Sequence, residues 1–245
     1  MPTTVLEDKV AVVAAFCGKE LVLQGARLGD EYFYQSLPLC VIDAVYSIGV
    51  KYKGVQNVAR RYCEYFGLQE FREPRDQVPP TGEQQPLSAL VEKMDALGIE
   101  KFTKGIFNNR QRTSPRGGIL KPEAIFRFAT VLRDNGMNFL QDVPPRVLDA
   151  ELEAELRQIP GQTSGISITY FFMLAGTENL IKPDRWIGRF LKRCLNAEPT
   201  PEEAQFLISG ACEMLLTEYP DLTPRLLDNV IWNYERAREQ GRISA

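Results

Sequence analysis

The 245-residue sequence contains no histidine. Histidine is the most frequent general base in enzymes and a usual ligand of zinc. Its absence excludes the nucleophilic sites in which histidine activates a serine or a cysteine. Any chemistry would therefore depend on carboxylates, lysine, tyrosine, serine or cysteine.

Cysteine is scarce and scattered, and no two cysteines have the Cys-x-x-Cys spacing of a metal site or redox pair. An odd number of separated cysteines indicates buried, reduced thiols rather than a disulfide framework. This usage is typical of a cytoplasmic protein. The five cysteines are Cys17, Cys40, Cys63, Cys194 and Cys212.

The sequence also lacks a long hydrophobic run. The apolar stretch from Val10 to Cys17 follows Glu7 and Asp8 and is far shorter than a membrane span. It has no basic leader, so it predicts a helix rather than a signal peptide. We expect no membrane association and a location in the cytoplasm, with DNA.

No segment alternates apolar and polar residues over a useful length, which argues against β-strands. Helix starts recur instead at Thr200-Pro201 and Thr223-Pro224, where a capping threonine precedes a proline, and another helix opens at Lys121-Pro122. A further helix over 88–96 should end at Gly98. The prediction is an all-α fold of about ten helices.

The net charge of -3 does not indicate nucleic-acid binding, but the positive charge is clustered. Residues 101–133 contain eight Lys or Arg and one acid, and residues 182–193 contain five and one. Two basic patches on an acidic chain are typical of a DNA binder that uses one groove. Taken alone, such runs are more often solvated surface.

One turn, Ile159-Pro160-Gly161-Gln162-Thr163-Ser164-Gly165, separates a predicted helix over 149–158 from an apolar one over 166–176. A turn of this kind exposes backbone N–H groups at the start of the second helix, where they suit a phosphate. We expect it to hold a DNA backbone without reading its sequence. A plain corner between packed helices is the alternative.

Asp184 follows Gly161 by 23 residues, after an apolar helix and a loop. Its position before a basic segment suits a helix N-cap. A carboxylate at such a place can also stabilise a sugar cation or activate water, as in glycoside hydrolysis, without histidine.

The order of hairpin, helix, loop and Asp184 resembles the helix-hairpin-helix DNA glycosylase superfamily. This superfamily includes endonuclease III, the adenine and 8-oxoguanine glycosylases, and 3-methyladenine glycosylase II. Residues 183–190 (PDRWIGRF) look most similar to the last, and residues 37–62 (LPLCVIDAVYSIGVKYKGVQNVARRY) resemble the first two helices of the family's domain. The resemblance covers residues 37–193.

The resemblance implies two helical lobes with a cleft between them. One lobe would span 37–193 and carry the hairpin and the catalytic Asp184, and the other would combine 1–36 with 194–245. It also implies double-stranded DNA as the partner of a monomeric protein. No cofactor is expected, except K⁺ or Na⁺ at the hairpin backbone.

The sequence departs from the family pattern at several positions. Thr163 replaces the second hairpin glycine, and Gly165 stands where bifunctional members carry the Schiff-base lysine. Gly49 replaces the glutamine that fills the gap left by the flipped base, and the four-cysteine iron–sulfur motif is absent. These departures predict an enzyme without lyase activity.

The predicted site residues fall into three further groups. The DNA backbone would be held by Gly161, Gln162, Thr163, Ser164 and Gly165, together with Arg185 and Arg189. The gap or the other strand would be contacted by Asn108, Asn109, Arg110, Gln111 and Arg112. A flipped base would stack on Tyr46, Tyr52, Tyr170 and Trp186, although core packing is the commoner role of such aromatics.

The leading hypothesis is a monofunctional DNA N-glycosylase that flips a damaged or modified base and leaves an abasic site. The base is not readable from the sequence: an alkylated base would indicate repair, and a hypermodified viral base would indicate defence. One alternative is an inactive DNA-binding module on the same scaffold. Another is a helical protein-interaction domain without a role on DNA.

Overall fold

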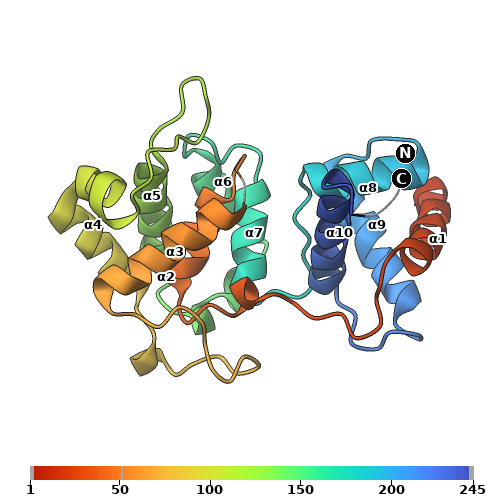
Figure 1. The fold of residues 1–245 in the computed structure, drawn as a ribbon, viewed down its shortest axis with the longest axis horizontal. Helices are drawn as coiled ribbons and strands as arrows, with labels where there is room; N and C mark the ends of the chain where they lie inside the picture. Colours follow the sequence, from red (N-terminus) through yellow and green to blue (C-terminus); the bar gives the residue numbers. More distant parts are fainter. Residues whose placement is uncertain (1–2, 51, 243–245) are drawn as a thin grey trace. The chain divides into compact units, whose positions relative to one another are not determined.

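The structure, a computed structural model, describes residues 3–50 and 52–242. These residues form ten α-helices and no β-strand (Figure 1). Two isolated β-bridges, Tyr34–Phe71 and Arg112–Leu120, are the only pairing of extended backbone in the described ranges. The all-α prediction is confirmed.

The chain divides into two compact units. The terminal unit contains the chain up to Leu28 and from Thr177 onward, and the central unit spans Gly29–Gly176. The boundaries expected after residues 36 and 193 therefore differ from the observed ones. Asp184 belongs to the terminal unit rather than to the unit with the hairpin, because the helix that follows it packs on the first and last helices.

The terminal unit has four helices. Its core is apolar, and α1 packs on α8 and α9 while α10 packs on α8 and α9. Thr200 and Thr223 cap α9 and α10 through their hydroxyl groups, as the sequence predicted, and Glu203 also completes a capping box at α9. The helices are α1 (Thr3–Glu20), α8 (Arg185–Leu195), α9 (Pro201–Leu215) and α10 (Pro224–Glu239).

The central unit is built around α2, all ten residues of which are buried. Helices α3, α4, α5 and α7 pack against α2, and α6 packs against α5. A π-helical turn, Phe102–Ile106, follows α4. The α-helices of this unit are α2 (Leu37–Tyr46), α3 (Tyr52–Phe66), α4 (Leu87–Lys101), α5 (Lys121–Asp134), α6 (Ala150–Arg157) and α7 (Ile166–Leu174).

Helix α4 is broken at the glycine that the sequence marked as its end. Gly98 has φ +77°, in the left-handed region that favours glycine, and the backbone returns to helical values up to Lys101. The helix was predicted to end at Gly98, but it is only interrupted there, and the helical path continues beyond Lys101 into the π-helical turn. That turn leads into the loop over 108–118, called here the arginine-rich loop, which precedes α5.

Lys121 fixes the start of α5 to the end of α2. Its ammonium group is fully buried and donates to the backbone oxygens of Tyr46, at 2.8 Å, and Ile48, at 2.7 Å. The last carbonyls of a helix lack intrahelical partners and carry partial negative charge, so a lysine stabilises them. This contact holds the carboxyl end of α2 close to the base of the arginine-rich loop.

Candidate functional site

The hairpin of the central unit joins α6 to α7. Gly161 and Gly165 both lie in the left-handed region, at φ +92° and +76°, and they let the chain reverse direction. Helix α7 begins at Ile166, so the N–H groups of its first turn have no preceding helical carbonyl to bond. Together with the helix dipole, these groups favour an anion at the turn.

The loop over 108–118 contacts this hairpin. A Cβ atom on Gly161 would lie 2.4 Å from the Cβ of Thr113, so the two backbones approach as closely as a glycine allows. Thr113 is buried, and its N–H donates to Ile119, which closes the base of the loop. Figure 1 shows the loop projecting beyond the helices of its unit.

The exposed arginines of the loop differ in their partners. Arg112 donates to the backbone oxygen of Gly118 at 2.6 Å and so stabilises the loop itself. Arg110 and Arg116 are exposed, and their side chains form no hydrogen bond or ion pair with any described residue. They are the charges of the loop that are free to meet a phosphate.

Among the other residues predicted to fill a gap or contact a strand, some form hydrogen bonds within the loop and others are exposed. Asn109 accepts a hydrogen bond of 2.9 Å from the backbone of Gln111, which shapes the loop. Asn108 is exposed and has φ +46°, a conformation that asparagine tolerates better than most residues. The structure therefore brings residues 108–112 to the surface beside the hairpin.

Gln162, predicted to contact DNA, is completely buried. Its side-chain oxygen accepts a short hydrogen bond from the Ser167 hydroxyl, and its side-chain nitrogen has no partner among the described residues. The turn folds this side chain inward, and the contact expected of Gln162 with DNA stays a prediction for its backbone. Thr163 and Ser164 are exposed and form a polar surface on the turn.

Arg157 lies against the inner side of the turn. It donates to the backbone oxygen of Thr163 at 2.6 Å and forms an ion pair with Glu153 at 2.7 Å. A Cβ on Gly165 would lie 2.4 Å from its guanidinium nitrogen, so only glycine leaves room for Arg157. A monovalent cation at this turn would have to share or replace this guanidinium contact.

Asp43, which the sequence reasoning missed, lies at the centre of the central unit and is fully buried. It accepts hydrogen bonds from the hydroxyl groups of Tyr34 (2.8 Å), Tyr52 (3.0 Å) and Ser47 (2.7 Å). Burial, and then the charge of Asp43, raise the pKa of Tyr34, Tyr52 and Tyr170 well above the ordinary value. The phenols therefore stay protonated, and those of Tyr34 and Tyr52 donate to the buried side chain of Asp43.

The aromatic residues proposed for a flipped base have separate settings. Tyr52 and Tyr170 surround Asp43, and Tyr46 is fully buried with its ring centre 5.5 Å from that of Phe107. The hydroxyl of Tyr46 has no hydrogen-bond partner among the described residues. Trp186 lies in the terminal unit, so these four residues do not form one set within either unit.

Asp184 caps α8, as its position predicted. One carboxylate oxygen accepts a hydrogen bond of 2.8 Å from the Trp186 amide. The other oxygen accepts none from the described residues, and the side chain is partly exposed. The cap therefore fixes the carboxylate while one oxygen is available for a further contact.

Positive charge surrounds Trp186 at the start of α8. The guanidinium groups of Arg185 and Arg189 lie 4.6 Å and 5.1 Å from the centre of the Trp186 ring, which is itself buried. Arg189 also pairs with Glu239 at 3.0 Å. Arg185 is exposed, so the first turn of α8 presents a cation next to Asp184.

A second aspartate, Asp228 on α10, lies near Asp184 and was also missed. It is only 4% exposed, and it accepts a hydrogen bond of 2.9 Å from the Lys182 amide. Burial, and then the negative charge of Asp184, raise the pKa of Asp228 well above its ordinary value. Asp228 therefore holds its proton to a higher pH than an ordinary aspartate does. The sequence feature that could have revealed Asp228 is the position of an aspartate on the apolar face of the predicted helix over 224–239.

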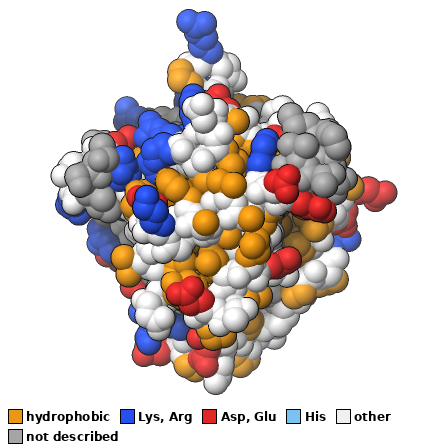
Figure 2. All heavy atoms as spheres, turned by 90° about the vertical axis from the view of Figure 1, so that its right-hand side faces the viewer, with side chains coloured by type: hydrophobic (Ala, Val, Ile, Leu, Met, Phe, Trp, Pro, Cys, Tyr) orange, Lys and Arg blue, Asp and Glu red, His pale blue; other side chains and the backbone are white. Residues whose placement is uncertain are grey.

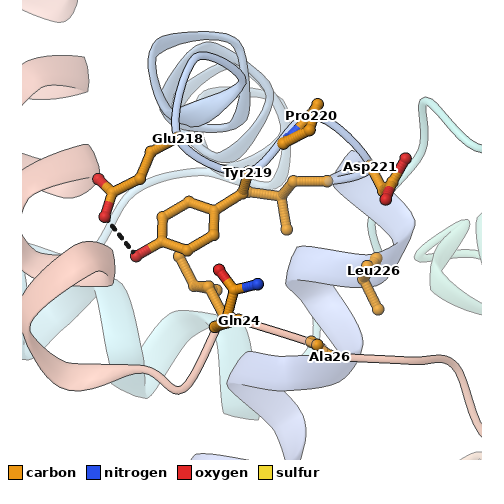
Figure 3. Close-up of a pocket in the computed structure, with 10 residues that line it drawn as sticks. Gln24, Ala26, Glu218, Tyr219, Pro220, Asp221 and Leu226 are labelled. Carbon is orange, nitrogen blue, oxygen red and sulfur yellow. Dashed lines mark hydrogen bonds between the residues drawn. The ribbon is translucent and has the colours of Figure 1, made fainter.

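The terminal unit also has two hollows that contain no predicted site residue. One, of about 170 Å³, lies between residues 23–26 and the turn before α10, where the Tyr219 hydroxyl donates to Glu218 at 2.9 Å (Figure 3). The larger, of about 540 Å³, lies between residues 20–27 and α10. Figure 2 shows apolar side chains on the face that it presents. In the terminal unit, α1 exposes Val12, and α9 exposes Phe206 and Met214.

The chain belongs to a family described as a domain of unknown function, DUF8548, which it matches over residues 11–236. No curated protein matches it, and no solved structure does. None of the helices in the described ranges has the length and apolar character needed to cross a bilayer. The described residues also contain no group of three or more Cys, Asp or Glu arranged to hold a metal ion.

Proposed function

We propose that the protein is a DNA N-glycosylase without lyase activity, acting as a monomer on duplex DNA in the cytoplasm. The observation that carries the proposal is the carboxylate of Asp184. It is fixed by the α8 N-cap, it keeps one oxygen available, and Arg185 lies beside it. Carboxylates in this kind of setting stabilise the sugar cation that forms when a glycosidic bond breaks.

The central unit would hold the DNA backbone. The α7 amides, the exposed Thr163 and Ser164, and the unpaired Arg110 and Arg116 lie on a hairpin and a loop that contact each other. These groups bind phosphate without reading base sequence. Asn108 and Arg110 would meet the gap or the opposite strand.

The reaction begins when the target nucleotide leaves the base stack, since stacking hides the N-glycosidic bond. The bond breaks with its electron pair passing to the departing base, which takes a proton from the solvent. Asp184 stabilises the positive sugar and accepts a proton from the water that attacks its anomeric carbon. Base release leaves an abasic site, and Gly165 offers no amine for a Schiff base.

Base release from a panel of duplexes tests the proposal. The panel carries alkylated, deaminated, oxidised and glucosylated bases, each scored for alkali-labile abasic sites. Asp184→Asn keeps a good N-cap but removes the charge, so it should lower release by about 100-fold or more while duplex binding persists. No release from any duplex by the wild-type protein would reject the enzyme. The base that is released would separate a repair role from defence against modified viral DNA.

A DNA-binding module without catalysis is the second candidate. The hairpin and the arginine-rich loop lie in the central unit, whereas Asp184 lies in the terminal unit, so binding does not require the carboxylate. Binding that falls steeply with salt, without base release, would identify this function. Absence of both activities would favour a protein-interaction domain.

A further inference from the structure

A chain of hydrogen bonds links α10 to the cap of α8. Asp228 accepts from the Lys182 amide at 2.9 Å, and the Lys182 oxygen accepts from the Asp184 amide at 2.6 Å. Asp184 in turn accepts from the Trp186 amide at 2.8 Å. The buried side chain of Asp228 is therefore connected to Asp184 through the backbone N–H and C=O groups of Lys182.

The segment before α8 is held at further points by the neighbouring helices. Gln205 on α9 accepts a hydrogen bond of 3.0 Å from the Ile181 amide, one residue before Lys182. Arg225 on α10 is 3% exposed, forms an ion pair with Glu178 and donates its amide to the Glu178 oxygen at 3.0 Å. Two consecutive amides, Ile181 and Lys182, are thus each satisfied by a side chain from a different helix.

We propose that Asp228 is a positioning residue, which holds the segment 181–184 so that the available oxygen of Asp184 faces the substrate. This inference rests on the proposed function. An apolar residue at 228 would leave the Lys182 amide unpaired in the interior, and the segment would move to find another partner. Displacement of a reacting group by about 1 Å is enough to slow a reaction substantially.

The side chain of Asp228 acts in this role as a hydrogen-bond acceptor. The charges of Asp184 and Lys182 act on its pKa, the first raising it and the second lowering it, and the Glu178–Arg225 ion pair lies at the same end of α10. The hydrogen bond requires only an acceptor oxygen at position 228, because the donor is the backbone amide of Lys182. A neutral acceptor at this position is sufficient, so asparagine should replace it.

The test compares Asp228→Asn with Asp228→Ala in the full-length protein. Single-turnover base release and duplex affinity are measured for each, corrected for the folded fraction. Asp228→Asn should release base at close to the wild-type rate. Asp228→Ala should release base about 10- to 100-fold more slowly while its duplex Kd stays unchanged. Thr200→Ala, which removes only the α9 cap, controls for general destabilisation of the terminal unit.

Hydrogen–deuterium exchange of the peptides that cover 181–186 gives a readout independent of catalysis. Asp228→Ala should accelerate exchange there, and Asp228→Asn should not. Unchanged exchange and rate in Asp228→Ala, or an equal loss of rate in Asp228→Asn, would overturn the inference. If exchange changes as expected but the wild-type protein releases no base, the segment is held by Asp228 and the glycosylase proposal is the one that fails.

Discussion

The guanidinium of Arg157 donates a hydrogen bond of 2.6 Å to the backbone oxygen of Thr163, within the turn that joins α6 to α7. It thus places a fixed positive charge at a turn where a monovalent cation was expected. Duplex affinity should therefore be the same in K⁺ and in tetramethylammonium at equal ionic strength. The variant Arg157→Leu should bind duplex more tightly in K⁺ than in tetramethylammonium. The backbone oxygen of Thr163 no longer has its guanidinium partner in this variant and can bind K⁺. Weaker wild-type binding in tetramethylammonium would instead show that a cation occupies the turn.

Gly161→Ala should destabilise the central unit and weaken duplex binding. The new Cβ would lie 2.4 Å from that of Thr113, at a φ of +92° that alanine rarely adopts. The expected cost is about 2–4 kcal/mol of unfolding free energy, measured by urea titration. Gly136→Ala is the matched control, since its φ is +79° and its Cβ would meet no atom within 4 Å. Equal losses in the two variants would show that the contact with Thr113 is unimportant.

The double variant Arg110→Gln/Arg116→Gln should bind every duplex more weakly, whatever its sequence. Each arginine that contacts a phosphate contributes about 0.9 to the slope of log K against log salt, so the slope should fall by about 2. The control is Arg60→Gln/Arg127→Gln, which removes the same charge from arginines already paired with Glu64 and Glu123. An equal fall in the control would point to net charge rather than to the loop.

The stability of the wild-type protein should fall as the pH rises above the ordinary aspartate pKa of 3.8, owing to Asp228. The folded state keeps this proton to a higher pH than the unfolded chain does, so unfolding releases it. Each pH unit in that window costs up to about 1.4 kcal/mol. Asp228→Asn lacks this dependence, so its Tm relative to the wild type should rise as the pH increases above the ordinary aspartate pKa. Parallel stability curves would show that Asp228 ionises normally.

The local features of this fold follow from short stretches of sequence. Thr200 and Thr223 predicted the starts of α9 and α10, and Gly98 marked the point where α4 is interrupted, because caps and left-handed turns depend on neighbouring residues. The cap at Asp184 was predictable for the same reason. The buried thiols were predictable from composition, and four of the five cysteines are buried.

The long-range features were not predictable in this way. The unit to which α8 belongs depends on its packing with α1 and α10, which lie far away in the sequence. Asp43 was missed because α2 is apolar on every side, so periodicity could not reveal that its one carboxylate has hydroxyl partners from other segments. The inward direction of Gln162 likewise depends on Ser167 and on the close approach of the neighbouring loop.

The division of the chain has a consequence for the order in which the protein is made. Helix α1 is synthesised before its partners α8 and α9, which follow the whole central unit in the chain. The central unit is contiguous and can fold as soon as Gly176 has emerged, while the apolar side of α1 waits for the last third of the chain. During synthesis α1 is therefore a segment whose apolar side a chaperone can cover.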